Sequence, residues 1–115
     1  MGYTNYKLQN YKGSITDLDK AIELGAESST DYNFRGASKL KLFDYEGAVS
    51  DLNRSIELGE NGSDVYYNRA LAKGRLENYV GAFEDLNKAI ALDPDNSRYY
   101  FDRASLYEKT ENYSE

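Results

Sequence analysis

The sequence predicts an all-α solenoid of stacked antiparallel helix pairs. The first observation is a fixed period, because the same residue types recur every 34 positions without an insertion. The recurring sets are Tyr11, Tyr45, Tyr79 and Tyr113; Leu18, Leu52 and Leu86; and Arg35, Arg69 and Arg103. The second is that each period holds two amphipathic stretches separated by a short polar break. A period of this size is typical of a repeat array. One helix pair cannot bury its apolar face alone, so neighbouring pairs must stack.

Each repeat is numbered 1 to 34 from Ser29, Ser63 and Ser97. These serines precede the apolar-periodic stretches and are predicted N-caps, since a serine hydroxyl can accept a bond from the first helical amides. In the repeat at 63, the first helix carries apolar, small or long side chains at Tyr66, Ala70, Lys73 and Leu76. After a break at residues 77–79, the second helix carries Ala82, Leu86, Ala89 and Ile90. The repeat at 29 follows the same plan.

Helix ends and close approaches are also visible in the sequence. Gly25 and Gly59 follow second helices and are predicted left-handed C-terminal caps. Asp93 and Pro94 replace that glycine in the third repeat, where proline stops the helix. Small residues share the positions where paired helices must approach, namely Gly36, Ala70 and Ala104 in one set, and Ala48 and Ala82 in another.

The whole chain, 1–115, is interpreted as a single array. Residues 1–28 form an N-terminally truncated repeat, with a partial first helix in 1–13 and a second helix after it. Residues 29–62 and 63–96 are complete repeats, and 97–115 supply a C-terminal capping helix of an incomplete repeat. Because Met1 and Gly2 lead directly into repeat sequence, the chain is interpreted as an excised segment that lacks its native targeting signals.

Charged residues recur in phase as well. The arginine at repeat position 7 and the aspartate at position 23 are predicted partners. Pairing within a repeat would leave Asp17 and Arg103 unmatched, whereas pairing with the following repeat leaves none over. The sequence therefore predicts the inter-repeat salt bridges Asp17–Arg35, Asp51–Arg69 and Asp85–Arg103.

Composition excludes several functions. The net charge is −6, whereas nucleic-acid binding needs a basic surface. The chain has no Cys and no His, which removes disulfides, the usual zinc fingers, thiol nucleophiles and imidazole catalysis. No apolar run reaches the roughly 20 residues of a membrane helix. No enzyme, metal or cofactor is expected, and the turn at 93–97 lacks the glycine and distant glutamate of a calcium loop. Absence of Cys favours a reducing compartment such as the cytoplasm.

This pattern resembles the tetratricopeptide repeat. The residues that match the family signature in phase are Tyr66, Ala70, Tyr79, Ala82, Leu86, Ala89 and Pro94. Arginine replaces the leucine of the family's Leu-Gly pair in every repeat, and Ala26 and Glu60 stand where the family closes with proline. The resemblance implies a right-handed superhelix whose first helices line a concave groove. It also implies a non-enzymatic scaffold that binds an extended peptide or partner segment in that groove.

The resemblance carries the groove onto specific positions of this chain, referred to below as the groove set. Its members are Tyr3, Tyr6, Lys7, Asn33, Lys41, Tyr67, Leu71, Arg75, Arg98, Phe101 and Lys109. Position 13 is basic in every repeat, and two interpretations stay open. The cations complement helix C-terminal dipoles, worth about 0.3–1 kcal/mol each, or they form a basic row that suits a peptide with acidic and apolar side chains.

Some family members grip the C-terminal carboxylate of chaperones with a clamp of Lys, Asn, Asn, Lys and Arg. The corresponding positions here hold Asn33, Ala37, Asn68, Arg98 and Asp102. Only Asn68 is identical, and Asp102 reverses a charge, so this clamp is not expected. An alternative function is self-association into a homo-oligomer by end-to-end stacking of the incomplete terminal helices, through Tyr100 and Tyr107. Incomplete ends of this kind can make heterologous contacts.

Overall fold

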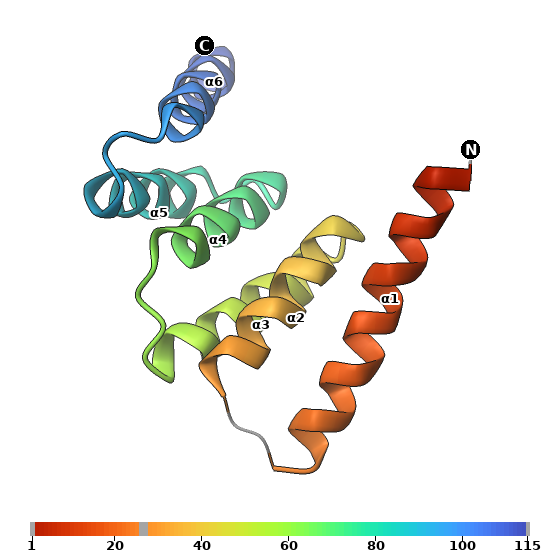
Figure 1. The fold of residues 1–115 in the computed structure, drawn as a ribbon. Helices are drawn as coiled ribbons and strands as arrows, with labels where there is room; N and C mark the ends of the chain where they lie inside the picture. Colours follow the sequence, from red (N-terminus) through yellow and green to blue (C-terminus); the bar gives the residue numbers. More distant parts are fainter. Residues whose placement is uncertain (1, 26–27, 115) are drawn as a thin grey trace. The chain divides into compact units, whose positions relative to one another are not determined.

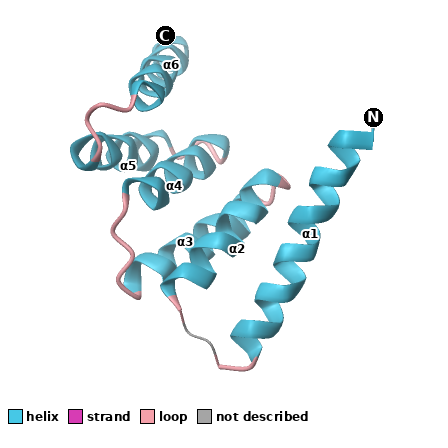
Figure 2. Ribbon diagram, in the orientation of Figure 1, coloured by secondary structure: helices cyan, strands magenta, loops and turns pink. Residues whose placement is uncertain are grey.

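The computed structural model describes residues 2–25 and 28–114, and the side chains within 10–25 and 28–111. The described residues form six helices and no strand (Figures 1 and 2). The helices are α1 (Gly2–Glu23), α2 (Ser29–Lys41), α3 (Tyr45–Glu57), α4 (Ser63–Arg75), α5 (Tyr79–Leu92) and α6 (Ser97–Ser114). The all-α class is confirmed. The chain divides into two compact units, Met1–Glu60 and Asn61–Glu115, called unit 1 and unit 2.

In unit 1, α2 and α3 form an antiparallel hairpin and α1 lies against α2 (Figure 1). The hairpin closes where Gly36 meets Leu52, and Leu52 and Ala48 are fully buried. A Cβ on Gly36 would stand only 2.9 Å from Leu52 Cγ, so glycine at this position lets the two helices approach closely.

In unit 2, α4 and α5 form the equivalent hairpin, and α6 packs on α5. Ala70, Ala82, Leu86 and Ala89 are buried at this hairpin. Tyr99, on the first turn of α6, is 5% exposed, and its hydroxyl lies 3.1 Å from the hydroxyl of Ser63. Small residues of the hairpin, together with Val65, Leu86 and one large ring from α6, therefore fill the core of this unit.

Both hairpins turn by the same device. The last residue of each break before the second helix caps it: Asp44 accepts a hydrogen bond from the Gly47 amide at 3.0 Å, and Asn78 accepts one from the Gly81 amide at 3.1 Å. A Cβ on Gly47 would lie 2.3 Å from the Asp44 carboxylate, so the capping side chain needs that glycine. The predicted N-caps are wrong, because Ser29 and Ser63 are the first helical residues and their neighbours before them make no side-chain cap.

The helix stops follow the sequence. Gly25 and Gly59 have φ values of 101° and 111°, which confirms their left-handed conformation. The helix α5 ends at Leu92, directly before Asp93 and Pro94, as predicted.

The expected break in the first repeat is absent, since α1 runs continuously through it. The Thr16 hydroxyl donates to the Lys12 carbonyl oxygen at 3.1 Å, one helical turn earlier. A Cβ on Gly13, the equivalent of Gly47, would meet nothing within 4 Å, so no capping side chain lies against it. Residues 2–9 are also too short for an independent helix, which needs about 12–15 residues in water.

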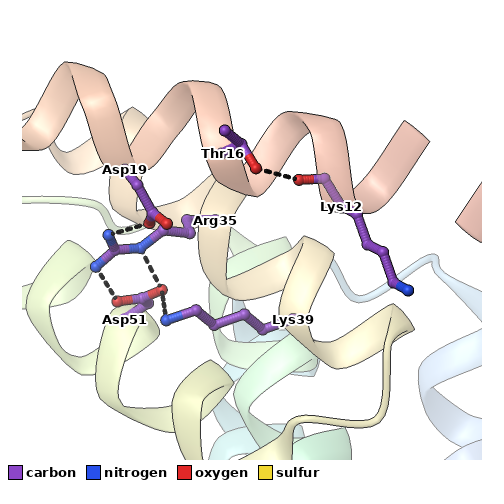
Figure 3. Close-up of polar contacts among 6 residues, drawn as sticks. All are labelled: Lys12, Thr16, Asp19, Arg35, Lys39 and Asp51. Carbon is purple, nitrogen blue, oxygen red and sulfur yellow. Dashed lines mark hydrogen bonds and ion pairs between the residues drawn. The ribbon is translucent and has the colours of Figure 1, made fainter. Parts of the chain in front are cut away.

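The buried aspartates pair within their own repeat, which corrects the predicted inter-repeat bridges. Figure 3 shows this pairing for Asp51. Asp51 is 4% exposed and accepts two hydrogen bonds from Arg35, each at 2.8 Å, while Lys39 Nζ lies 3.1 Å away. Asp85 is held in the same way by Arg69 at 2.8 Å and Lys73 at 3.2 Å. The hydrogen bond to Asp51 raises the pKa of Arg35, and the hydrogen bond to Asp85 raises that of Arg69.

The arginine at repeat position 7 also contacts the preceding repeat, but its partner there is not the predicted Asp17. Arg35 Nη1 bonds Asp19 at 2.8 Å, and Arg103 Nη1 bonds Asn87 at 2.9 Å. Since successive helical residues are about 100° apart, Asp17 and Asp19 point to nearly opposite sides of α1. The repeat-to-repeat contact therefore uses the residue two positions after the predicted one.

A double-mutant cycle tests this pairing. Because Asp85 is buried, Asp85→Ala leaves Arg69 and Lys73 without their carboxylate, and we expect a loss of about 3–5 kcal/mol in the free energy of unfolding. The coupling between Arg69→Ala and Asp85→Ala is expected to be on the order of 1–3 kcal/mol in urea titrations. The cycle of Asp17→Ala with Arg35→Ala serves as control and should show coupling near zero; equal coupling in both cycles would refute the within-repeat assignment.

Candidate functional site

The members of the groove set are divided between unit 1 and unit 2. In unit 1, Asn33 is buried at 9% exposure and offers little surface to a partner, whereas Lys41 is exposed. The side chains of Tyr3, Tyr6 and Lys7 lie outside the described residues. The remaining members belong to α4 and α6 of unit 2, so the candidate site is built there.

Three members of the groove set line one cavity in unit 2, which we call the α4–α6 cavity. Its volume is about 230 Å³. Its lining comes from α4, α5 and α6 and consists of Ala70, Leu71, Gly74, Arg75, Leu86, Asp102, Ser105, Leu106 and Lys109. Leucines from all three helices form the apolar wall, and the charged side chains of Arg75, Asp102 and Lys109 border it.

Asp102 is engaged by neighbouring side chains. The Tyr67 hydroxyl donates to its carboxylate, and Arg98 Nε lies 3.8 Å from the same oxygen. The Tyr67 ring also packs on Tyr99, with the ring centroids 4.8 Å apart. Burial raises the pKa of Tyr67, and the hydrogen bond to Asp102 raises it further. These contacts join α4 to α6 beside the cavity and fix the position of the carboxylate.

Arg75 and Lys109, in contrast, are exposed at the cavity. Among the residues whose side chains are described, neither makes an ion pair. The structure bears differently on the two interpretations of the basic residue at position 13, a helix-dipole role and a basic row along the groove. Lys41 and Arg75 lie in the last turns of α2 and α4, where they complement the helix dipole. Lys109 lies before the last turn of α6, which contains no basic residue, so the dipole does not account for its position.

The other members of the groove set on α6 face solvent. Phe101 is 69% exposed, and the Arg98 side chain is 73% exposed. The residues named for self-association are both tied to unit 2. The Tyr107 ring packs on Phe83 with centroids 4.7 Å apart, and the Tyr100 hydroxyl donates to the Pro94 carbonyl oxygen at 2.8 Å. Tyr107 remains 54% exposed and Tyr100 41%.

Sequence reasoning missed the residues that leave the cavity open. Gly74 and Ser105 occupy repeat positions 12 and 9, both of which belong to the groove by family resemblance. The prediction of the groove set did not include them, although small side chains are what leave a volume between two leucine-bearing helices. Leu106 was missed because it belongs to the wall rather than to the expected groove face.

Within the described residues no three or more carboxylates gather as a metal site would require. None of the helices over the same residues is long and apolar enough to cross a membrane.

Two family models match the C-terminal half of the chain. Both describe the tetratricopeptide repeat, the first over residues 63–96 and the second over residues 86–115. Residues 63–115 therefore match the tetratricopeptide repeat family. Tetratricopeptide repeats are non-enzymatic interaction modules, in agreement with the lack of a catalytic constellation in the sequence. A comparison with curated protein sequences gives no match.

Solved structures extend the fold over almost the whole chain. The tetratricopeptide domain of Arabidopsis OM64 aligns with a TM-score of 0.82 and 24% identity, over 93% of this chain and 88% of that one. MamA from Desulfovibrio magneticus, solved from residue 41 to the end, aligns with a TM-score of 0.85 and 24% identity, over 99% of this chain and 64% of that one. The first tetratricopeptide domain of Spaghetti (RPAP3), bound to an HSP90 peptide, aligns with a TM-score of 0.83 and 19% identity, over 95% and 86%. These likenesses establish a tetratricopeptide fold.

The Tyr67–Asp102 contact predicts a pH-dependent stability. The pKa of the Tyr67 hydroxyl lies above its ordinary value of 10.0, so the folded state holds the phenolic proton more tightly than the unfolded state. The resulting stabilisation is fully present below pH 10 and is lost as the pH rises through the folded pKa. We expect Tyr67→Phe to lower the unfolding free energy by about 1 kcal/mol at neutral pH.

The measurement is a series of urea titrations of wild type and Tyr67→Phe between pH 7 and pH 12. Comparing the two proteins cancels the other eleven of the 12 tyrosines. The difference should shrink above pH 10, and a difference that stays constant to the highest pH would contradict the assignment.

Proposed function

We propose that this chain is a protein-interaction module that holds an extended peptide of a partner protein against the first helices α4 and α6. The observation that carries the proposal is the convergence of Leu71, Arg75 and Lys109 on one open cavity. These residues come from two helices, and the family resemblance implies that all three belong to one binding groove. An apolar cavity with a few polar groups at its border is the usual form of a ligand site.

Known neighbours support this function by analogy. The first and second tetratricopeptide domains of RPAP3 are bound to an HSP90 and an HSP70 peptide, respectively. Their identities of 19% and 22% transfer the fold but not the ligand. In this chain Asp102 stands where a clamp for a chaperone tail needs arginine. The Asp102 carboxylate accepts a hydrogen bond from the Tyr67 hydroxyl and forms an ion pair with Arg98. Because this position carries a negative charge, the peptide we propose is not the chaperone tail.

A peptide array tests the interaction function. Phe101 is 69% exposed on the proposed face and Val80 is 72% exposed on the second helix α5, so both can be replaced without disturbing a core. We expect Phe101→Ser to weaken the peptides selected by wild type about three- to tenfold, because one buried ring in the complex contributes roughly 0.5–1.5 kcal/mol or more. Val80→Ser is the matched control and should bind like wild type. Equal behaviour of the two variants, or no selected peptide, would refute the proposal.

A second candidate function is self-association, and one observation favours it. Ala104 is exposed on α6, whereas its equivalents Gly36 and Ala70 are buried against their second helices. Tyr100 and Tyr107 flank this face, and these residues are 41% and 54% exposed. A second copy of the chain that packs a helix on this face would bury it, through a heterologous contact that can repeat.

Light scattering over a wide concentration range tests self-association. The variant is Ala104→Glu, because Tyr107→Glu would also remove the packing of Tyr107 on Phe83 within unit 2. We expect the mass of wild type to grow with concentration and Ala104→Glu to stay monomeric. The control is Ala91→Glu, at an exposed alanine of α5. A wild type that is monomeric at every concentration would eliminate this candidate.

A further inference from the structure

The α4–α6 cavity differs in charge from the rest of the protein. The chain carries a net charge of −6, yet two exposed cations, Arg75 and Lys109, border this cavity. The one carboxylate in its lining, that of Asp102, already accepts a hydrogen bond from the Tyr67 hydroxyl and forms an ion pair with Arg98. The cavity therefore offers two cationic groups that the described side chains do not neutralise, next to an apolar wall.

Unit 1 contains a hollow at the same repeat register, and its described lining differs in charge. A second cavity, of about 290 Å³, is lined by Ser14, Asp17, Leu18, Phe34 and Ser38. Leu18, Phe34 and Ser38 hold the same repeat positions as Leu86, Asp102 and Leu106. The stacking of repeats thus leaves a hollow at this register in both units. Among the side chains that the structure describes, the unit 1 hollow is lined by the carboxylate of Asp17, whereas the unit 2 hollow is lined by Arg75, Lys109 and Asp102.

The volume of the α4–α6 cavity sets the size of the group that enters it. A cavity of about 150 Å³ lined by apolar residues holds a benzene molecule. At about 230 Å³, this cavity has room for a leucine, isoleucine, methionine or phenylalanine side chain. Leu71, Leu86 and Leu106 supply the apolar contacts that such a side chain needs.

The cations set the chemistry beside that group. A guanidinium can bind a carboxylate through two parallel hydrogen bonds, and a lysine ammonium adds a point charge. Both positions are exposed, so a carboxylate can reach them without the cost of being buried. A neutral or basic peptide would leave both charges without a partner.

We propose that the α4–α6 cavity is a specificity subsite that takes one apolar side chain whose neighbouring carboxylate binds Arg75 and Lys109. The occupant is a segment of a partner protein with an apolar residue directly beside a carboxylate. That carboxylate is either an aspartate or glutamate side chain or the C-terminus of the partner chain. This proposal rests on the peptide-binding function proposed above and names the ligand chemistry of the same face.

The test measures the dissociation constants of fluorescent probe peptides by anisotropy. The first probe is an acetylated and amidated peptide with one leucine between two glutamates in a Gly/Ser background. In its controls, glutamine replaces both glutamates, or serine replaces the leucine. A further pair ends in leucine, once as the free acid and once as the amide, to distinguish a C-terminal from a side-chain carboxylate.

Matched protein variants separate charge from shape. Arg75→Glu and Lys109→Glu reverse the charges at the cavity, and Lys41→Glu makes the same change at the same repeat position in unit 1. Ser105→Phe fills the cavity from an exposed position, and Ser50→Phe is its control on an exposed serine of α3. Circular dichroism confirms that each variant is folded.

We expect Arg75→Glu, Lys109→Glu and Ser105→Phe each to weaken the acidic probe about tenfold or more, because each removes a charge-assisted contact or the space for the side chain. Lys41→Glu and Ser50→Phe should change it less than twofold. Binding of the free acid but not the side-chain probe would support the subsite with a C-terminal carboxylate as its ligand.

Two results overturn the subsite. One is a wild type that binds none of the acidic probes; a peptide from the array would then still support the interaction function. The other is a wild type that binds a probe which Arg75→Glu and Lys109→Glu weaken no more than Lys41→Glu does. In that case, a loss with Phe101→Ser would keep peptide binding on this face while removing the proposed chemistry.

Discussion

The buried aspartate inside each hairpin is the constraint on which the arrangement of the repeat depends. Asp51 and Asp85 are each 4% exposed, and a carboxylate at that depth is tolerated only when it is paired and hydrogen-bonded. Both partners come from the same first helix, four residues apart, so they form one stripe: Arg35 with Lys39, and Arg69 with Lys73. One carboxylate that contacts two points along a helix fixes the rotation of that helix against its partner. The remaining donor of Arg35 contacts the preceding helix at Asp19.

That rotation also positions the candidate site. Leu71 and Arg75 follow Arg69 and Lys73 by two residues, which is about 200° around the helix. The stripe that holds the hairpin together and the stripe that faces the α4–α6 cavity therefore lie on nearly opposite sides of α4. On α6 the chain departs from this plan, because Tyr107 stands where Lys39 and Lys73 stand in the complete repeats. Instead of meeting a buried carboxylate, Tyr107 packs on Phe83 of α5.

Periodicity was enough to predict the features that depend on local sequence. The hairpins, the left-handed glycines and the proline stop need only a residue and its near neighbours, and they were confirmed. The predicted salt-bridge partners were wrong because a repeat pattern gives the number of possible partners but not the distances between them. Pairing within a repeat and pairing between repeats both satisfied the spacing at Asp51. The predicted break in α1 was wrong because its polar residues match a cap in type, while a break also needs a preceding helix that can form alone, and residues 2–9 are too short for that. The cavity could not be read from the sequence, since it arises where Gly74 and Ser105 contribute little volume.

The protein carries a net negative charge, and so does the ligand that we propose, so long-range repulsion between them has to be compared with the local attraction at the cavity. At physiological ionic strength the Debye length is about 8 Å, so exposed charges further apart than this are largely screened. Most of the net charge of −6 therefore acts weakly on a carboxylate at the cavity, whereas Arg75 and Lys109 line the cavity itself. A carboxylate in direct contact with an exposed cation gains roughly 0.2–1 kcal/mol, and this gain depends on the nearest charges. In the proposed complex, the local pair of cations, rather than the overall charge, would select the peptide, and the net negative charge of the remaining surface would disfavour polyanions that extend beyond it.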